Sequence, residues 1–257
     1  MTRLVTWNVN SLKVRLPQVL EWLASQQPDV LCLQETKLQD KDFPLAEINA
    51  AGYQALFSGQ KTYNGVAILS KQAGCDTSVG IAGFHDDQRR VLSATIEDVR
   101  VVCIYVPNGQ SVGSEKFQYK LDWLEALTGW LEAELLRYPR LALLGDFNIA
   151  PEDRDVYDPA AWAGQVLCSA PEREAFRRLL ALGLKDSFRL FGQAEKSYSW
   201  WDYRMNAFRR NLGLRIDHIL LSEALAPQCT AGEIDKEPRR NERPSDHAPA
   251  MATIQPL

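Results

Sequence analysis

Six short segments of this sequence each end a strand-like apolar run in polar residues suited to a metal ion and a phosphate. Together they contain carboxylates, carboxamides, a phenol and an imidazole, with no cysteine ligand and no serine elbow. Oxygen donors of this kind suit a hard divalent cation, and the whole set suits metal-assisted hydrolysis of a phosphate ester. The segments are residues 7–10 (WNVN), 33–36 (LQET), 105–108 (YVPN), 145–148 (GDFN), 215–218 (RIDH) and 245–247 (SDH).

Two candidate metal ligands end neighbouring predicted strands. Glu35 follows the apolar run 30–33, and Asn8 ends the preceding run in the same way. A carboxylate in this position can bind a metal, but it can also cap a helix or stand as an edge charge. The end of a buried strand favours the metal ligand, with the capping alternative left open.

Asp146 and Asn148 are the candidates for activating a water molecule. They follow the apolar run 141–144 and Gly145, a glycine that we expect to permit a turn. Their spacing of two lets both side chains point to one side. A carboxylate and a carboxamide placed together can accept a proton from water and fix its orientation. The alternative is an Asx-turn in which Asp146 only bonds the backbone.

His247 follows Asp246 and precedes a short apolar strand, and the chain has only two other histidines, His85 and His218, for which we predict no catalytic role. Adjacent strand residues point to opposite faces, so Asp246 need not bond His247. Asp217, on another strand, could orient His247 instead. A carboxylate behind an imidazole fixes its tautomer and supports its positive charge. His247 could then donate to a phosphate oxygen. The alternative is a surface histidine in a turn.

Other catalytic classes fit the sequence poorly. There is no G-x-S-x-G elbow and no P-loop, and no two histidines or cysteines share the spacing of zinc ligands. The five cysteines are widely spaced without C-x-x-C, and Cys32 and Cys103 lie inside apolar strands. We interpret them as buried thiols of a cytoplasmic protein, with a catalytic cysteine as a minor alternative.

The bulk composition suits one α/β domain over residues 1–257. The chain is 46% hydrophobic, yet its longest apolar runs are too short to span a bilayer, and it opens on a strand without a signal region. We therefore expect a cytoplasmic protein with no membrane partner. The net charge is −4, but basic residues cluster at 89–90, 204–215 and 239–243. These clusters are candidate nucleic-acid contacts, and solvated faces are the alternative.

The order of predicted elements indicates two sheets packed face to face with helices outside. Several strands are continuous apolar runs, which are typical of strands covered on both faces. Helices are predicted around the stripe 16–23, with Pro17 in the first turn, over about 115–137, and after Ser169, with Gly183 as a stop. The strands are predicted at 4–9, 30–34, 54–58, 66–70, 92–96, 101–106, 141–146, 197–201, 216–222 and 248–254.

With these residues in place, the chain resembles the exonuclease III family of apurinic/apyrimidinic (AP) endonucleases, within the endonuclease/exonuclease/phosphatase superfamily. The resemblance covers essentially the whole length. The matching motifs are 7–12 (WNVNSL), 34–37 (QETK), 65–67 (GVA), 105–108 (YVPN), 145–150 (GDFNIA), 199–203 (SWWDY), 213–217 (GLRID) and 245–249 (SDHAP).

The resemblance implies a four-layer α/β sandwich and a phosphodiesterase dependent on Mg²⁺ or Mn²⁺. By it, Asp146 would position or deprotonate water, Tyr105 would contact phosphate, and Asp217 would orient His247. Family members cleave duplex DNA 5′ to abasic sites or process 3′ ends, and leave a 3′-hydroxyl. We expect a monomer. The implied metal site comprises Asn8, Glu35, Asp146, Asn148, Asp246 and His247, and the implied catalytic set Tyr105, Asp146, Asn148, Asp217 and His247.

Recognition of damage is expected to depend on shape, because an abasic nucleotide offers no base to read and can be flipped into a tight pocket. Trp200, Trp201 and Leu214 match the family's apolar pocket, with core packing as the alternative. Leu167 lies, by resemblance, in a loop that approaches this pocket. Candidate contacts to the DNA backbone are Lys61, Tyr63, Asn108 and Arg204.

Two alternative functions are compatible with the same fold. Superfamily relatives hydrolyse inositol phosphates, sphingomyelin or RNA tails, but the segment 200–203 and the match at 214–217 favour DNA repair. Other relatives have lost catalytic residues and act as regulators. This chain retains the full set of acids together with Asn148 and His247, which favours an enzyme.

Overall fold

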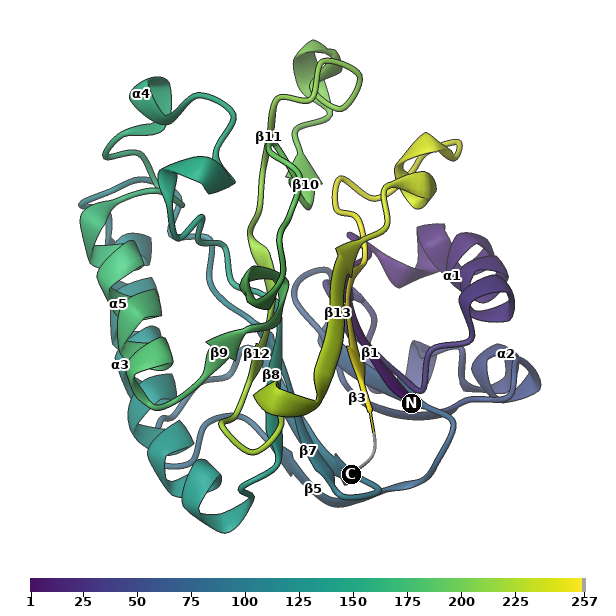
Figure 1. The fold of residues 1–257 in the computed structure, drawn as a ribbon. Helices are drawn as coiled ribbons and strands as arrows, with labels where there is room; N and C mark the ends of the chain where they lie inside the picture. The colour runs from purple at the N-terminus through teal and green to yellow at the C-terminus, as the bar shows by residue number, and fades with distance from the viewer. Residues whose placement is uncertain (256–257) are drawn as a thin grey trace.

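Two mixed sheets of six strands pack face to face in the computed structural model, and helices cover their outer faces (Figure 1). The structure describes residues 1–255. The first sheet has the order β13-β14-β1-β2-β4-β3 and the second the order β5-β6-β7-β8-β12-β9. Helices α1 (Leu12–Gln26) and α2 (Leu45–Ala50) lie on the first sheet, and α3 (Glu115–Arg137) and α5 (Ala170–Ala181) on the second. The predicted four-layer sandwich is confirmed.

The strands of the first sheet are β1 (Thr2–Asn8), β2 (Val30–Gln34), β3 (Gln54–Ser58), β4 (Val66–Ser70), β13 (Cys229–Ile234) and β14 (Ala250–Ile254). Those of the second are β5 (Gly74–Val79), β6 (Val91–Ile96), β7 (Val99–Tyr105), β8 (Leu141–Asp146), β9 (Lys185–Asp186) and β12 (Asp217–Leu221). A separate ribbon of β10 (Trp200–Trp201) and β11 (Gly213–Leu214) stands at the top of Figure 1, near the short helix α4 (Pro159–Trp162).

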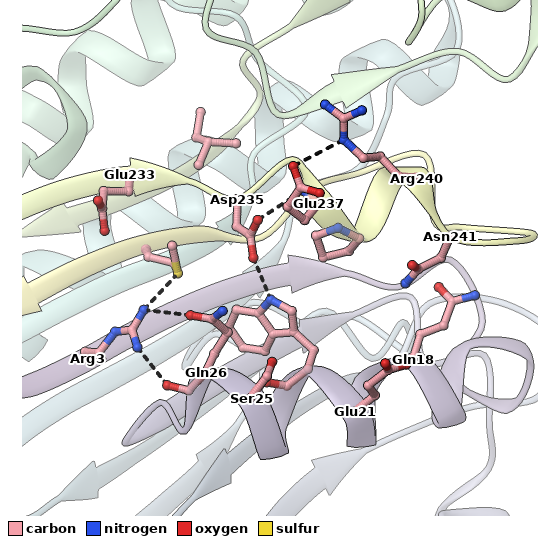
Figure 2. Close-up of a pocket in the computed structure, with 14 residues that line it drawn as sticks. Arg3, Gln18, Glu21, Ser25, Gln26, Glu233, Asp235, Glu237, Arg240 and Asn241 are labelled. Atoms are coloured by element: carbon pink, nitrogen blue, oxygen red, sulfur yellow. Dashed lines mark hydrogen bonds and ion pairs between the residues drawn. The ribbon is translucent and has the colours of Figure 1, made fainter.

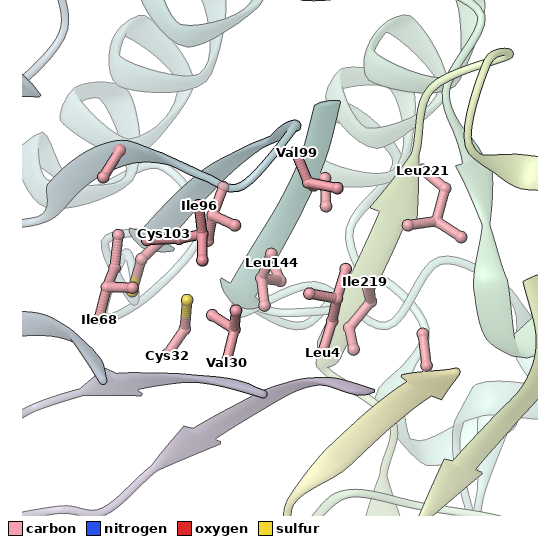
Figure 3. Close-up of a cluster of buried hydrophobic side chains, with 14 of the residues drawn as sticks. Leu4, Val30, Cys32, Ile68, Ile96, Val99, Cys103, Leu144, Ile219 and Leu221 are labelled. Carbon is pink, nitrogen blue, oxygen red and sulfur yellow. The ribbon is translucent and has the colours of Figure 1, made fainter. Parts of the chain in front are cut away.

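The core between the sheets is mostly apolar where the central strands cross, with Thr6 and Gln34 as buried polar residues that bond each other. Figure 3 shows Leu4 and Val30 of the first sheet facing Leu144 and Ile219 of the second. The next residue along each strand points outward to a helix, as Val5 does toward α1. Both faces are therefore buried, which explains why the central strands read as continuous apolar runs. Each such side chain contributes about 1.5–3 kcal/mol when fully buried.

Edge strands are where the sequence-based strand predictions were incomplete. The predicted runs at the sheet centres are confirmed, but β5 and β13 were missed because most of their residues are partly or fully exposed. The two-residue strands β9 and β11 carry no apolar run. The strand predicted at 197–201 is reduced to Trp200 and Trp201, which pair with Leu214 and Gly213.

Two of the three predicted helices have the expected ends. Helix α3 matches its predicted bounds, and α5 begins with a capping box between Ser169 and Glu172. The first helix was placed too late, because it starts at Leu12 and Pro17 lies in its interior. Its first turn is held from outside the helix, where the backbone N–H of Leu12 donates to the carbonyl of Thr36. A proline in the first turn was therefore not needed.

The strand pairings bring the polar ends to one edge of the molecule. Strand β1 runs parallel to β2, so that Asn8 lies beside Gln34, and β7 runs parallel to β8, so that Tyr105 lies beside Asp146. Strand β12 runs antiparallel to β8 and starts at Asp217, opposite Asp146. The carboxyl ends of four strands therefore meet the start of β12 at the same edge.

Gly145 serves close packing rather than a turn, which corrects the expectation from the sequence. It lies inside β8 and pairs with Ile104 of β7. A Cβ atom at this position would lie 1.9 Å from the carbonyl oxygen of Ile104. The glycine is required because β7 and β8 approach closely just before Asp146.

A buried ionic network fixes the β10–β11 ribbon to the second sheet. Arg215 is 1% exposed; its Nε donates to Asp155 at 2.7 Å and its Nη2 lies 2.8 Å from Asp186. Its Nη1 donates to His218, whose other ring nitrogen donates to the carbonyl of Ile149. Burial lowers the pKa of His218 to about 4, assisted by Arg215, so this histidine is neutral and structural.

Within residues 1–255, no helix is long and apolar enough to cross a membrane.

We predict that Arg215→Ala will lower the free energy of unfolding by about 3–5 kcal/mol, because it leaves the buried Asp186 without its cation and Asp155 with only Arg189. The matched control is Arg240→Ala, which breaks the exposed pair with Glu237 and should cost at most about 1 kcal/mol. Urea unfolding followed by circular dichroism measures both values. Equal losses in the two variants would contradict the assignment.

Candidate active site

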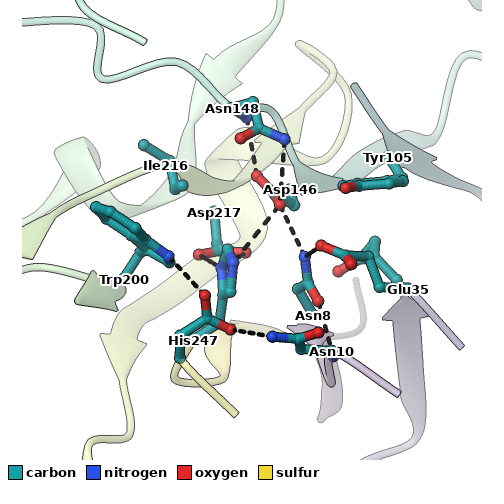
Figure 4. A network of polar contacts seen from close by, with 12 residues as sticks. Asn8, Asn10, Glu35, Tyr105, Asp146, Asn148, Trp200, Ile216, Asp217 and His247 are labelled. Carbon is teal, nitrogen blue, oxygen red and sulfur yellow. Dashed lines mark hydrogen bonds and ion pairs between the residues drawn. The ribbon is translucent and has the colours of Figure 1, made fainter. Parts of the chain in front are cut away.

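Asp146 is the centre of the polar cluster at this edge (Figure 4). Its Oδ2 accepts a hydrogen bond of 2.9 Å from Asn8 Nδ2, which belongs to the other sheet. Its Oδ1 accepts from the backbone N–H of Asn148 at 2.8 Å, and Asn148 Nδ2 also reaches Oδ2 at 3.4 Å. The Asx-turn considered from the sequence is therefore present, but it occupies only one oxygen of Asp146. The second oxygen faces the site.

His247 lies between Asp217 and Asp146. Its Nδ1 donates to Asp217 Oδ2 at 2.8 Å, and its Nε2 lies 3.7 Å from Asp146 Oδ2. Asp217 is held in turn by the hydroxyl of Ser199, which donates at 2.6 Å. Trp7 Nε1 donates to the carbonyl of His247 at 3.2 Å. The imidazole is thus buried and oriented, unlike the surface histidine considered as the alternative.

The charges of this cluster are strongly coupled. Burial raises the pKa of Asp146 to about 7, opposed by the nearby charge of His247. Burial alone would lower the pKa of His247, but Asp217 and Asp146 raise it to about 10. The imidazole is therefore protonated at neutral pH. It presents a positive N–H on the side of Asp146, where a negatively charged phosphate oxygen could accept it.

Glu35 and Asn8 close the other side of the cluster. Asn8 Nδ2 donates to Glu35 Oε1 at 2.9 Å as well as to Asp146, so one amide holds two carboxylates. Lys37 Nζ lies 2.9 Å from Glu35 Oε2. Tyr105 lies between these acids and the guanidinium of Arg90, which stacks 4.7 Å from its ring centre. Burial, with Glu35 and Asp146, raises the pKa of Tyr105 well above its usual value, so its phenol stays neutral.

Asp246 points away from His247, as expected for adjacent residues near a strand. Its Oδ1 accepts from Asn10 Nδ2 at 3.0 Å and its Oδ2 from Trp200 Nε1 at 2.9 Å. Burial would raise the pKa of Asp246, but His247 and these two donors hold it below the usual value. Asp246 therefore ties the β10–β11 ribbon to the loop after β1 and stays negatively charged beside the site.

The donor set fits a divalent cation. Asp146, Asp217 and His247 each offer a ligand atom, and these atoms lie within 4.8 Å of one another. Glu35 adds a carboxylate joined to Asp146 through the Asn8 amide. Carboxylate oxygens dominate, as hard cations require, and a bound cation would offset the burial that raises the pKa of Asp146. The amide oxygens of Asn8 and Asn148 already accept hydrogen bonds, from Asn10 N and from Asn108 Nδ2.

The apolar residues expected to line a nucleotide pocket are only partly brought together. Leu214 packs with Leu167 and Ile216 in one cluster, and Trp200 lies against it. Trp201 does not belong to this wall. It is fully buried in a separate cluster and donates from Nε1 to Asn211 at 3.1 Å. Adjacent strand residues point to opposite faces, so the core-packing alternative holds for Trp201.

The four candidate DNA contacts lie on exposed loops. Lys61 and Tyr63 stand on the loop between β3 and β4, with Tyr63 67% exposed. Asn108 is exposed and donates to Asn148 Oδ1 at 3.2 Å, which connects it directly to the cluster. Arg204 is exposed and pairs with Asp202 at 2.8 Å. Of the four, only Asn108 contacts a residue of the central cluster.

Two polar residues of the site were not singled out from the sequence. Ser199 donates to Asp217 and accepts from the backbone N–H groups of Ile216 and Asp217. Asn10 connects Asp246 with Lys37, whose Nζ donates to Asn10 Oδ1 at 2.6 Å. Both lie inside motifs that the sequence displays, at 199–203 and 7–10. Their contacts span different elements, so only the fold reveals their roles.

A second hollow lies away from this cluster, between α1 and β13 (Figure 2). Its polar groups are largely paired with one another. Trp22 Nε1 donates to Asp235 at 2.8 Å, and Arg3 donates to the carbonyl of Gln26 at 2.7 Å. The hollow contains none of the residues that form the polar cluster, and its hydrogen bonds connect α1 with β1 and with the segment after β13.

The comparison with known proteins agrees with this geometry. Residues 5–247 match the model of the Endonuclease/Exonuclease/phosphatase family. The chain belongs to this family. Exodeoxyribonuclease III of Haemophilus influenzae is 38% identical over 266 residues, which cover 97% of this chain and 98% of that protein.

Two solved structures of this family are similar over the whole chain. One is a 3′ phosphatase, NExo from Neisseria, bound to a product DNA hairpin. It is 48% identical, with a TM-score of 0.98, and the match covers 99% of this chain and 100% of the other. The second is an AP endonuclease from Archaeoglobus fulgidus, 39% identical with a TM-score of 0.95 and full coverage of both chains. The predicted exonuclease III membership and the prediction of a metal-dependent nuclease are confirmed.

We predict that Asp217→Asn will lower the pKa of His247 well below about 10, because Asp217 is the largest group that raises it. The folded-state pKa lies above the ordinary value of about 6.5. The stabilisation is therefore complete below that value and is lost as the pH rises through about 10. The stability gap between wild type and variant should be widest near about pH 6 and narrow at higher pH.

Histidine resonances followed by NMR in the metal-free protein measure the titration, and urea unfolding across pH measures the stability gap. Asp235→Asn is the control, since Asp235 accepts from Trp22 and not from His247. It should leave the His247 titration unchanged. A titration of His247 that is the same in Asp217→Asn and wild type would refute the assigned pairing.

Proposed function

We propose that this protein is a DNA-repair phosphodiesterase that cleaves duplex DNA 5′ to abasic sites and removes nucleotides or blocking groups from 3′ ends. The observation that supports this most is Asp146, held by amides from both sheets and facing a His247 that Asp217 keeps protonated. The activities named for the similar proteins are 3′ phosphatase and AP endonuclease. Both are hydrolyses of a phosphate ester by water, which this site suits.

In the proposed reaction, one water molecule attacks the phosphorus atom and its proton passes to Asp146. Asp146 suits the role of general base, because its buried carboxylate is held in place by the amides of Asn8 and Asn148. Asn148 donates to the carboxylate of Asp146 and so helps to fix the group that holds the water. The bond between phosphorus and the 3′ oxygen breaks and the leaving oxygen takes a proton from solvent water, so that cleavage of the diester gives a 3′-hydroxyl and a 5′-phosphate. No covalent intermediate is required.

Hydrogen-bond donors that are already in position would stabilise the negative charge that develops on the phosphate. The protonated His247 offers Nε2–H, and the neutral phenol of Tyr105 offers O–H from the opposite side. Donors fixed before the reaction stabilise the transition state without reorganisation, which makes this kind of term large. Asp217 acts through His247 by fixing its orientation and its proton.

The metal that we propose is Mg²⁺ or Mn²⁺, held by Glu35 with Asp146 and Asp246 nearby, and with the amides of Asn8 and Asn148 at its border. When bound, it would supply Lewis-acid stabilisation of a phosphate oxygen. In this arrangement His247 would act as a cation rather than as a metal ligand, because its Nε2–H is the donor proposed for the phosphate oxygen while its Nδ1 donates to Asp217. The resemblance gave His247 both a catalytic and a metal-binding role, and we propose the catalytic one.

Binding of DNA would use the loops around this edge. Lys61, Tyr63 and Arg204 would contact the backbone, and Trp200 with Leu214 would form the wall of a pocket for a flipped abasic sugar. We further propose that the chain acts as a monomer and as one domain in the cytoplasm, where the buried free thiols Cys32 and Cys103 would remain reduced.

The function is tested with end-labelled duplexes that carry either one internal abasic analogue or a recessed 3′ end. We predict cleavage of both with Mg²⁺ and none with a chelator. Glu35→Ala should reduce the rate at least about a hundredfold, because metal stabilisation of charge is worth several kcal/mol. The control Glu237→Ala changes an exposed acid outside the cluster and should retain the wild-type rate. Full activity in chelator would reject the metal-dependent mechanism.

The balance between internal cleavage and 3′-end processing is predicted to depend on Leu167. Leu167 has a φ of 75°, rare for a leucine, and it packs against Leu214 in the pocket wall. Removing its side chain enlarges the space for an internal sugar, whose flipping already costs a few kcal/mol. We predict that Leu167→Gly raises the ratio of kcat/KM on internal abasic duplex to that on a recessed 3′ end by more than about twofold.

Leu167→Ala should give an intermediate ratio, since it removes only part of the side chain. The two ratios are measured on the same enzyme preparations, so that differences in folded fraction cancel. If Leu167→Gly stays within about twofold of wild type, the loop does not set the balance.

A further inference from the structure

Lys120 is a fully buried lysine that contacts two loops of the active site from behind. It is 0% exposed, and its Nζ donates to the backbone carbonyls of Asn148 at 2.6 Å and Asn108 at 3.1 Å. The third contact of its ammonium is Glu172 Oε1, at 2.5 Å. All three protons of the ammonium group are therefore used. Because the side chain is buried, it cannot itself touch a DNA substrate.

Glu172 extends this contact to a third loop, the one that carries Leu167. Its Oε1 also accepts from the backbone N–H of Leu167 at 2.9 Å. Its Oε2 accepts from the backbone N–H and the hydroxyl of Ser169, which form the capping box of α5. Like Lys120, Glu172 is 0% exposed. One buried ion pair thus joins the loops at Asn108, Asn148 and Leu167.

The three loops adopt backbone conformations that need such support. Asn148 has a φ of 50° and Leu167 a φ of 75°, a left-handed conformation that non-glycine residues keep only where the surroundings hold them. Gly109 has a φ of 93°, and a Cβ there would lie 3.1 Å from Lys120 Cδ. The loop after β7 therefore rests directly on the lysine side chain.

Stability alone gives a poor reason for this pair. Lys120 interrupts the apolar stripe of α3 formed by Phe117, Leu124 and Leu127. Replacing a buried ion pair by apolar residues of similar volume is often neutral or stabilising. An apolar side chain could not hold two carbonyl groups and a carboxylate at once. The ammonium group donates three hydrogen bonds in three directions. An apolar residue at this position would make none of them.

We propose that Lys120 and Glu172 are a positioning pair that couples the hydrolytic centre to the wall of the nucleotide pocket. Lys120 sets Asn148 and Asn108 beside Asp146, and Glu172 sets Leu167 against Leu214. The pair determines both the rate of hydrolysis and the choice between internal abasic sites and 3′ ends. This inference rests on the proposed DNA hydrolysis and adds residues that contact no substrate.

A second buried pair on the same helix provides the matched control. Glu134 of α3 accepts from Arg100 Nε of β7 at 2.9 Å, and the other hydrogen bonds of the guanidinium go to Asp76, Ser78 and Ser93. None of these residues belongs to the polar cluster or to the loops that surround it. Lys120→Met combined with Glu172→Gln, and Arg100→Met combined with Glu134→Gln, thus remove comparable ion pairs with different expected consequences.

The experiment measures kcat and KM on the internal abasic duplex and on the recessed 3′ end, with saturating Mg²⁺ and rates corrected for the folded fraction. We expect the Lys120/Glu172 double variant to lose kcat about tenfold or more, since small misplacements of reacting groups have large effects, and to change the substrate ratio more than about threefold. The Arg100/Glu134 variant should lose stability but keep kcat and the ratio within about twofold.

Single variants separate the two halves and remain informative if the double variant does not fold. Lys120→Met should mainly lower kcat on both substrates, and Glu172→Gln should mainly change the substrate ratio. Folded variants of Lys120 and Glu172 with kcat and ratio within about twofold of wild type would overturn the proposal. Wild-type protein that cleaves neither duplex would instead refute the proposed function itself.

Discussion

The contact of Asn8 with Asp146 joins the two sheets at the point where their polar strand ends meet. Asn8 ends β1 of one sheet and Asp146 ends β8 of the other, and the hydrogen bond between them is buried. Everything else in the site is arranged around this contact, because Glu35 shares the same amide and His247 faces the same carboxylate. The contact forms only if the sheets pack with these two ends aligned.

The alignment is set by the apolar core rather than by the polar groups. The inner faces of β1, β2, β7 and β8 supply the side chains that fill the space between the sheets. Burial of this surface provides the driving force that compensates for desolvating Asp146, Asp217 and His247. The cost of that desolvation is visible in the raised pKa of Asp146. Stability and function are thus connected, since the core forces charged groups together that would otherwise remain in water.

Buried charges of this protein serve different purposes according to what they contact. Arg215, with Asp155 and Asp186, fixes the pocket ribbon to the second sheet. Lys120 and Glu172 support loops from behind the site. His247 and Asp217 face the place where a phosphate would lie. In each case hydrogen bonds in several directions satisfy the buried ions, which is the condition for tolerating them in a protein interior.

Local sequence patterns were enough to predict the fold class, most central strands, the helices α3 and α5, and the polar residues at the strand ends. These features depend on local patterns, such as apolar runs, the capping box at Ser169 and acids that directly follow a strand. The strands β5 and β13 were not predicted, because their exposed residues carry no such pattern.

Which side chains share a face, and what each of them contacts, depends on how distant segments pack. Trp200 and Trp201 are equivalent in sequence, but strand alternation sends one to the pocket wall and the other to a separate core. The sequence suggested a turn at Gly145, but the glycine is required by the close approach of β7. Lys120 lies on an apolar helix stripe, where its role depends on loops 12 to 52 residues away in sequence. Contacts between distant segments arise from packing, which no local pattern records.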